Sequence, residues 1–358
     1  MSSLSRLALA PLTAAYGGAV RARLALYRRG ALPQHRLAVP VLSVGNLTAG
    51  GTGKTPLVER LARAVAGREG KRVCVLTRGY GREDARRRVV VSDGKSVLAE
   101  ARAAGDEPLL LAERLLDVGV AVVCDADRVA AARFALEKFG SEVFILDDGF
   151  QHLRVTRDMN IVTLDATDPW GGGRLLPAGM LREPVAGLSR ADCVVITRVE
   201  LAKDSDALRA EASRLTSGRP VFAANTRLVG VKLISQSVSE TATQGEPPRV
   251  VAAFCGVGNP RAFFANLRGG GYELRRTRAF ADHHDYTQGD VEETEREAQA
   301  AGATALVTTA KDAIKLRALR FGMPCYEIEI ELEIDDEPGF MELVRAAIAE
   351  GDKKGSIA

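Results

Sequence analysis

Short, almost wholly apolar runs alternate with helix-like stretches through the first part of the chain, and this alternation limits the possible folds most strongly. The apolar runs have the length of strands and occupy residues 39–44, 72–76, 118–124, 143–146, 161–164 and 193–196. Stretches rich in Ala, Leu, Glu and Arg, such as 56–66 and 108–116, lie between several of them. Strands that are apolar on both faces belong to parallel sheets covered by helices on both sides. The sequence therefore predicts an α/β fold whose ligands bind beyond the carboxyl ends of the strands.

A second unit of the same kind follows a change of pattern near residues 217–220. Residues 221–234 have an extended pattern, 235–249 are polar and contain two adjacent prolines, and a new apolar run begins at residue 250. Later, 305–308 are again apolar, 325–334 alternate like a strand, and 340–349 have the pattern of a last helix. The chain has 358 residues, enough for two domains of roughly 100–200 residues each. We predict an N-terminal domain at 1–225, a linker at 226–245 and a smaller C-terminal α/β domain at 246–358.

Charge and cysteine spacing exclude several classes of protein. The net charge is +3, which is too small for a general polyanion binder, so we expect no nucleic-acid partner. The five cysteines lie far apart, without the paired spacing of metal ligands, which indicates a reduced, cytoplasmic protein without disulfides. No secretory signal is recognisable, and the longest uncharged N-terminal stretch, 7–20, is too short to span a membrane.

Residues 4–29 have the spacing of an amphipathic helix. Arg21, Arg28 and Arg29 lie mostly to one side of an apolar stripe, which consists of Leu9, Leu12, Tyr16, Val20, Leu24 and Tyr27. Two interpretations remain open. Either the helix packs on the protein's own core, or it lies on an anionic membrane surface, where each basic residue contributes about 1 kcal/mol.

A glycine-rich turn between the strand at 39–44 and the helix at 56–66 is typical of a phosphate-binding loop. Its backbone would curl around phosphate oxygens, Lys54 would reach the β- and γ-phosphates, and the Thr55 hydroxyl would ligate Mg²⁺. The positive end of the following helix adds to the site. The predicted nucleotide-binding residues are Thr48, Ala49, Gly50, Gly51, Thr52, Gly53, Lys54 and Thr55.

Two positions of this loop are informative. Thr48 stands where the usual pattern has its first glycine, which allows a different first turn, but the Gly-Lys-Thr end is intact. Partition-type ATPases carry a lysine where this chain has Ala49, so that class is disfavoured. The remaining alternative is a chance glycine turn without function.

Acidic residues follow the apolar run at 143–146. Asp147 and Asp148 would emerge beside the phosphate loop and hold a metal, because adjacent carboxylates in an apolar run are costly to bury without a cation. A surface turn is the alternative. His152 would either orient a carboxylate or cap that turn.

Two further segments have both a functional and a structural interpretation. Asp106 or Glu107, in Gly105-Asp-Glu-Pro108, is either a helix N-cap or a site residue. The loop Asp282-His-His-Asp285 is either exposed surface or part of a catalytic centre. A zinc site is disfavoured there, since no cysteine or third histidine lies at ligand spacing.

In this order along the chain, the segments resemble the tetraacyldisaccharide 4′-kinase family, the lipid A kinases of Gram-negative bacteria. The resemblance covers almost the full chain, and even Thr48 matches the family's loop. The matching segments are 43–56, Thr77-Arg-Gly-Tyr80, Gly105-Asp-Glu-Pro108, Asp147-Asp-Gly-Phe-Gln-His152, Leu175-Leu-Pro-Ala-Gly-Met-Leu-Arg-Glu-Pro184, Gly256-Val-Gly-Asn-Pro260, Phe280-Ala-Asp-His283 and Thr309-Ala-Lys-Asp312.

The resemblance implies a kinase that uses ATP and Mg²⁺ to phosphorylate the 4′-hydroxyl of a lipid A disaccharide 1-phosphate. It implies two α/β domains joined by a β-ribbon, at the cytoplasmic face of the inner membrane, with an anionic membrane surface as partner and no obligate protein partner. Asp106 would be the general base, and His283 would orient and tune it. Glu107, Asp147 and Asp148 would serve the metal together with Thr55. The basic residues that would meet the substrate's phosphate are Arg78, Arg174 and Arg182.

Two rival functions are a partner-regulated P-loop ATPase that docks on membranes and a membrane-bound scaffold that only binds anions. The first predicts dimerisation that depends on nucleotide and no lipid acceptor. The second predicts that Asp106 is dispensable.

Overall fold

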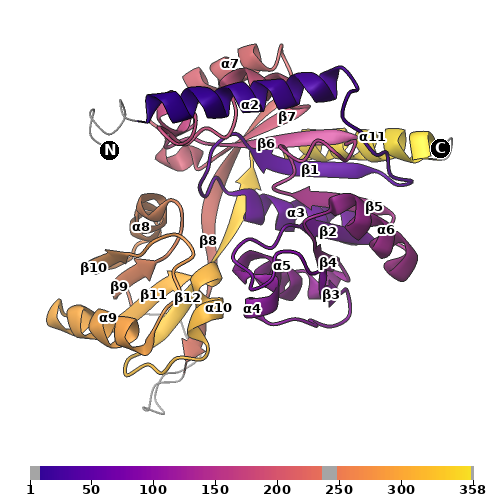
Figure 1. Cartoon of the computed structure of the whole chain (residues 1–358). Helices are drawn as coiled ribbons and strands as arrows, with labels where there is room; N and C mark the ends of the chain where they lie inside the picture. Colours follow the sequence, from indigo (N-terminus) through magenta and orange to yellow (C-terminus); the bar gives the residue numbers. More distant parts are fainter. Residues whose placement is uncertain (1–8, 236–247, 356–358) are drawn as a thin grey trace.

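The computed structural model describes residues 9–235 and 248–355 and arranges them around one twelve-stranded sheet (Figure 1). Its strands are β1 (Val41–Asn46), β2 (Val73–Thr77), β3 (Val89–Asp93), β4 (Ala121–Cys124), β5 (Val143–Asp147), β6 (Met159–Asp165), β7 (Cys193–Thr197), β8 (Val221–Ser235), β9 (Val250–Cys255), β10 (Glu273–Ala279), β11 (Ala305–Thr309) and β12 (Cys325–Ile334). Their order is β10-β9-β11-β12-β8-β7-β6-β1-β5-β2-β4-β3. Among these strands only β3–β4 and β8–β12 pair antiparallel. The predicted α/β class with a mainly parallel sheet is confirmed.

Helices cover both faces of this sheet (Figure 1). The α-helices are α2 (Ala10–Arg28), α3 (Lys54–Gly67), α4 (Ala101–Ala104), α5 (Asp106–Arg114), α6 (Arg128–Phe139), α7 (Ser205–Leu215), α8 (Pro260–Gly269), α9 (Gln288–Ala300), α10 (Ala310–Leu316) and α11 (Glu337–Gly355). Short 3-10 turns are η1 (Leu116–Val118), η2 (Gly171–Gly173), η3 (Val185–Arg190) and η4 (Val199–Leu201). We call residues 9–220 with α11 the N-terminal unit and residues 248–324 the C-terminal unit, and β8 and β12 join the two.

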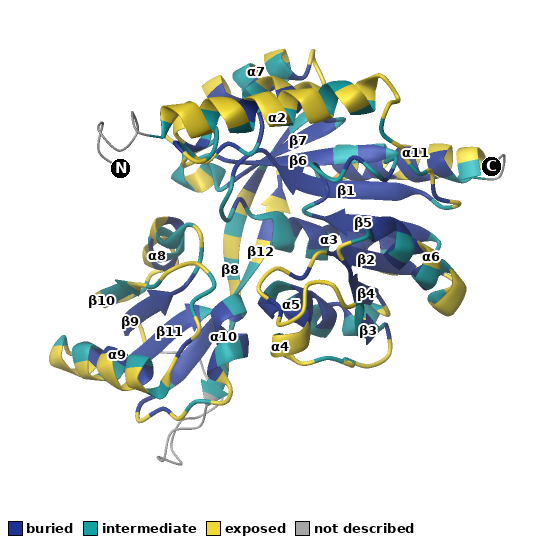
Figure 2. Cartoon of the chain, in the orientation of Figure 1, coloured by how far each residue is buried: buried dark blue, intermediate teal, exposed yellow. Residues whose placement is uncertain are grey.

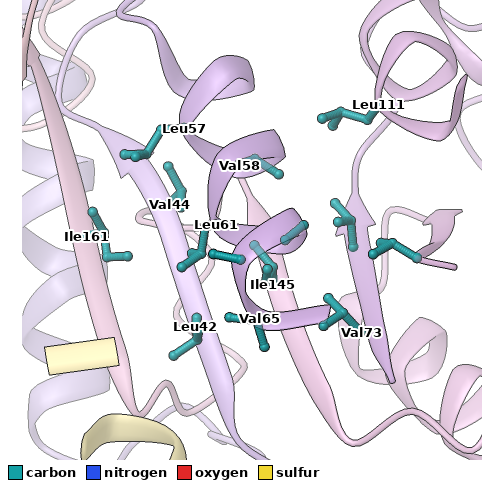
Figure 3. Close-up of a cluster of buried hydrophobic side chains, with 14 of the residues drawn as sticks. Leu42, Val44, Leu57, Val58, Leu61, Val65, Val73, Leu111, Ile145 and Ile161 are labelled. Atoms are coloured by element: carbon teal, nitrogen blue, oxygen red, sulfur yellow. The ribbon is translucent and has the colours of Figure 1, made fainter. Parts of the chain in front are cut away.

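The central strands β1 and β5 are buried along their whole length and are mostly apolar (Figure 2). In β5, Ile145 belongs to the cluster under α3, whereas Phe144 and Leu146 belong to the cluster under α6. Figure 3 shows the α3 side, where Leu57 and Leu61 meet side chains of β1, β5 and β6. Each such side chain stabilises the fold by about 1.5–3 kcal/mol when fully buried. This packing fixes α3, and with it the loop that precedes α3, against the sheet edge.

The connection between the units is a strand pair rather than a linker. β8 begins beside β7, with Val194 opposite Val221, and then continues antiparallel to β12 from Ala224, opposite Ile334, onward. Residues 226–235 of the predicted linker are therefore strand, because their backbone is paired along β12, and the rest of that linker lies outside the described residues. The β-ribbon that the family resemblance implied is present.

The last helix returns to the N-terminal unit (Figure 1). On α11, Phe340 and Val344 are buried in the same cluster as Leu42 and Val58. Phe340 also packs edge-on against Phe222 of β8, with ring centroids 5.4 Å apart. The prediction assigned all of 246–358 to the second domain. The structure differs because the apolar stripe of α11 covers the first sheet.

The helix α2 lies on the outside of the N-terminal unit and is mostly exposed or half-buried (Figure 2). Within this helix only Gly17 is buried. Gly17 packs where a Cβ would come within 2.8 Å of Leu175, and the Tyr16 hydroxyl donates to the Arg182 carbonyl at 2.7 Å. The helix thus contacts the segment 175–182 along one narrow edge and is not a core helix. Among the described residues, no helix is both long enough and apolar enough to span a membrane.

Candidate active site

A cleft of about 1140 Å³ lies between the two units. The phosphate-loop residues 49–55 form part of its wall, and residues 257–259, 282–283 and 309–311 of the C-terminal unit face them. Tyr16, Val20 and Leu24 of α2 also line the cleft. The cleft opens at the carboxyl ends of the parallel strands, where ligands bind in sheets of this kind.

The phosphate loop has the predicted position between β1 and α3. Gly50 and Gly53 have φ values of 114° and 76°, which a side chain would strain. Lys54 donates to the Asn46 side chain at 3.2 Å, and Asn46 donates to the Thr48 carbonyl at 2.8 Å, so the lysine is folded onto its own loop. The Thr48 backbone also bridges to Leu181.

Asp147 and Asp148 follow each other at the end of β5 but have opposite environments. Asp147 is buried and accepts a hydrogen bond from the Thr77 hydroxyl at 2.9 Å. Burial, reinforced by the charges of Glu107 and Asp148, raises the pKa of Asp147 to about 6. Asp147 is therefore the acid that would gain most from a bound cation.

Asp148, by contrast, is paired with two cations. Burial by itself would raise its pKa, but Lys54 and Arg182 lower that pKa to about 2. Arg182 donates to both Asp148 oxygens, at 2.8 and 2.6 Å, and Lys54 lies 3.5 Å away. Arg182, predicted as a contact for the substrate's phosphate, is thus engaged with Asp148, which was predicted to hold the metal.

The structure brings Asp106 and His283 together from opposite units. Asp106 is the first residue of α5, 4% exposed, and its Oδ2 lies 3.2 Å from His283 Nδ1. Gly105, not Asp106, is the N-cap residue of α5, so the N-cap alternative is wrong. His283 adopts a left-handed backbone with φ 61°. The ring of His284 instead stacks on Phe280 and reaches Asp290 at 3.2 Å.

Asp106 is held in its charged form. Burial would raise its pKa, but the hydrogen bond from His283 and the charges of Lys315 and Lys311 lower the pKa to about 2. Lys315 lies 3.2 Å from the same Oδ2 that faces His283. The environment of Asp106 therefore fixes its position and charge and does not make it a stronger base.

The helices α5 and α10 lie side by side (Figure 1), and cations of the C-terminal unit contact acids of α5. Lys311 lies 3.0 Å from Glu107, and Arg317 makes a two-pronged contact with Glu113 at 2.6 and 2.7 Å. Together with Lys315 and Asp106, these pairs join the two units beside the cleft. Glu107, predicted as a metal ligand, is engaged in one of them.

The loop 256–259 touches the phosphate loop directly. A Cβ on Gly258 would lie 2.5 Å from the Gly51 nitrogen, so only glycine permits this approach. Asn259 donates to Asp165 at 2.9 Å, and Arg198 contacts Asp165 and donates to the Gly51 carbonyl at 2.7 Å. The phosphate loop is thereby held from both units.

Several of these contacts were not predicted. The motifs around Asn259 and Lys311 were recognised in the sequence, but nothing local to them indicates a partner. Arg78 lines the cleft and is exposed, whereas Arg174 is exposed outside the lining. The buried Nε2 of His152 has no hydrogen-bond partner among the described residues, so it orients no carboxylate there.

Replacing Asp147 should stabilise the protein in a manner that depends on pH. A carboxyl whose pKa is raised from 3.8 to about 6 loses stability as pH rises through this range. In a chelating buffer, the free energy of unfolding of Asp147→Asn should equal that of the parent protein below pH 4. At pH 8 it should be about 3 kcal/mol higher than that of the parent protein. Denaturant unfolding at both pH values measures this. Equal shifts at pH 4 and pH 8 would show that ionisation is not the cause.

Comparison with known proteins identifies the family to which this chain is similar. Residues 5–349 match the family described as Tetraacyldisaccharide-1-P 4'-kinase. Two relatives named Tetraacyldisaccharide 4'-kinase come from Anaeromyxobacter dehalogenans (strain 2CP-C), 44% identical over 87% of this chain and 82% of its own, and from Geobacter metallireducens, 43% identical over 92% and 94%. A solved structure, the "apo" form of LpxK from Aquifex aeolicus in complex with ATP, is 34% identical with a TM-score of 0.75, covering 96% of this chain and 99% of its own. The chain therefore belongs to the tetraacyldisaccharide-1-P 4'-kinase family.

Proposed function

We propose that the protein transfers the γ-phosphoryl group of ATP to the 4′-hydroxyl of a tetraacyldisaccharide 1-phosphate, a lipid A precursor. One observation carries the proposal: Lys54 of the phosphate loop and His283, the partner of Asp106, line the same cleft. The names of the relatives and the ATP complex of the Aquifex aeolicus protein support it. One wall of the cleft would take the nucleotide and the other the acceptor hydroxyl.

On the nucleotide side, the backbone of residues 48–53 and Lys54 would hold the phosphates. Thr55, Asp147 and Asp148 would hold Mg²⁺, which supplies charge neutralisation at the β- and γ-phosphate oxygens. Among the described residues, no three His, Cys, Asp or Glu side chains are grouped as a metal site. This fits Mg²⁺, which binds through one or two carboxylates plus phosphates and water. Glu107 would become a further Mg²⁺ ligand only if its ion pair with Lys311 were broken.

On the acceptor side, Asp106 would receive the proton of the 4′-hydroxyl. Its contacts with His283 and Lys315 both go to Oδ2, so Oδ1 would be the oxygen that receives the proton. Phosphoryl transfer passes through a loose transition state, so positioning of the hydroxyl matters more than the strength of the base. An ionised carboxylate with a fixed orientation meets that requirement.

Lys54→Ala should lower the rate of phosphate transfer by about 10²–10³-fold, because it removes a preorganised charge from the transferring phosphate. The assay follows labelled phosphate from ATP to a lipid A disaccharide 1-phosphate in detergent micelles. Lys95→Ala, at an exposed position, is the matched control. No transfer by the folded parent protein would refute the proposed function, and near-normal transfer by Lys54→Ala would refute the assignment of the loop.

We also propose that α2 holds the protein on the anionic cytoplasmic face of the inner membrane. Leu12 and Leu26 are 60% and 43% exposed, Arg21 and Arg28 are exposed on the same helix, and Arg29 is exposed at its C-cap. Apolar and basic side chains together favour the interface of an anionic bilayer. Because residues of α2 line the cleft, this placement would present the cleft to a lipid acceptor.

A double variant, Leu12→Gln with Leu26→Gln, should weaken binding to anionic vesicles by about tenfold or more, because two apolar anchors are lost. Raising the salt concentration should also weaken binding of the parent protein, since salt screens exposed charges. Leu98→Gln, at a position 57% exposed and far along the chain from α2, is the control. Sedimentation with vesicles measures both effects. Equal binding by the double variant and the parent would contradict this placement.

A further inference from the structure

Lys311 contacts the second nitrogen of His283, the one that does not face Asp106. Its Nζ lies 3.1 Å from His283 Nε2, 3.0 Å from a Glu107 oxygen and 3.1 Å from an Asp282 oxygen. The lysine side chain is 13% exposed. Three acceptors therefore surround one ammonium group at hydrogen-bonding distance.

The chemistry of these groups decides which histidine nitrogen carries the proton. An ammonium group has three N–H donors and no lone pair, so it can only donate. Nε2 must then accept, which requires its lone pair to be free of a proton. In a neutral imidazole the proton is left on Nδ1, the nitrogen that faces Asp106 at 3.2 Å. A doubly protonated ring would direct an N–H of Nε2 against the lysine ammonium.

We propose that Lys311 fixes His283 as the neutral tautomer with its proton on Nδ1, and that His283 in this form donates to Asp106. Lys311 is thus a positioning residue that acts through His283. The tautomer follows from the contacts alone, whereas its value for catalysis rests on the proposed kinase function. One consequence is that His283 cannot take a proton through Nε2 while Lys311 is in place.

The opposite tautomer would need an uncharged lysine. Lys311 lies between Glu107 of α5 and Asp282 of the histidine's own loop, two carboxylates that favour its charged form. Although burial lowers the pKa of Lys311, these two acids raise it above its ordinary value. Glu107 Oε1 and Asp282 Oδ1 lie 4.0 and 3.9 Å from His283 Nε2, which is beyond hydrogen-bonding distance. The ring of Tyr80 packs against that of His283, with ring centroids 5.1 Å apart.

Lys315, one turn further along α10, has a separate task. Its Nζ donates to the backbone carbonyls of His283 and His284, at 2.9 and 3.1 Å, and contacts Asp106 at 3.2 Å. It therefore holds the loop whose residue His283 has a left-handed backbone. Lys315 holds the position of the ring, and Lys311 keeps Nε2 of that ring free of a proton.

Nitrogen-15 NMR of the histidine rings tests the proposal directly. Two-bond proton–nitrogen correlations distinguish the tautomers, and with only four histidines in the chain, His283→Gln assigns the signals. In the full-length parent protein at pH 8, we expect His283 to be protonated on Nδ1 only. Lys311→Met should lose this pattern, because Nε2 is then free to bind a proton beside Glu107 and Asp282 while Asp106 still accepts from Nδ1. Lys311→Arg, which also only donates, should retain the pattern. Lys95→Met is the control.

A parent protein with the proton on Nε2, or an unchanged pattern in a folded Lys311→Met variant, would overturn the proposal. In the transfer assay, Lys311→Met should lower kcat by about 10²-fold with little change in KM for ATP, as expected for a misplaced catalytic group. Lys311→Arg should recover most of that loss. If the tautomer changes as expected but the parent protein transfers no phosphate, the kinase function fails and the role of Lys311 stands.

Discussion

The pairing of buried charges between α5 and α10 is the interaction on which the site depends. A buried carboxylate such as Asp106 is costly unless cations and hydrogen bonds compensate it. Its compensation comes from His283 and Lys315, which belong to the other unit. The site is therefore complete only while the two units meet, and the charges that hold them together also set the orientation of the proposed base.

The strand pair β8–β12 makes this meeting possible. It continues the sheet from one unit into the other, and α11 then packs on the first sheet. Arg60 of α3 donates to the Leu332 carbonyl of β12 at 2.7 Å and to Glu337 at 2.9 Å. The helix that follows the phosphate loop is thus tied to the ribbon, while Gly258 meets the loop itself. The part of the cleft proposed to bind the nucleotide and the part proposed to bind the acceptor are therefore connected through the same sheet.

The sequence was sufficient for features that arise locally. Apolar runs indicated the central strands, and the glycine turn before Lys54 indicated the phosphate loop, because each is read from neighbouring residues. Contacts between distant segments could not be read in this way. Lys311 and Asn259 stand in ordinary helix-start segments, and only the fold brings them to Glu107 and Asp165. The packing of α11 on the N-terminal unit was not predicted for the same reason. An apolar stripe indicates that one face of a helix is buried, but it does not indicate which part of the protein buries that face.

The central claim is that Asp106 and His283, contributed by different units, act as one catalytic group. A double-mutant cycle tests it, with kcat measured at saturating ATP and lipid presented in mixed micelles. Asp106→Ala should lower kcat by about 10²–10⁴-fold, and the double variant with His283→Ala should be hardly worse than the poorer single variant. Losses that multiply in the double variant would contradict the claim, because they would show two residues acting independently.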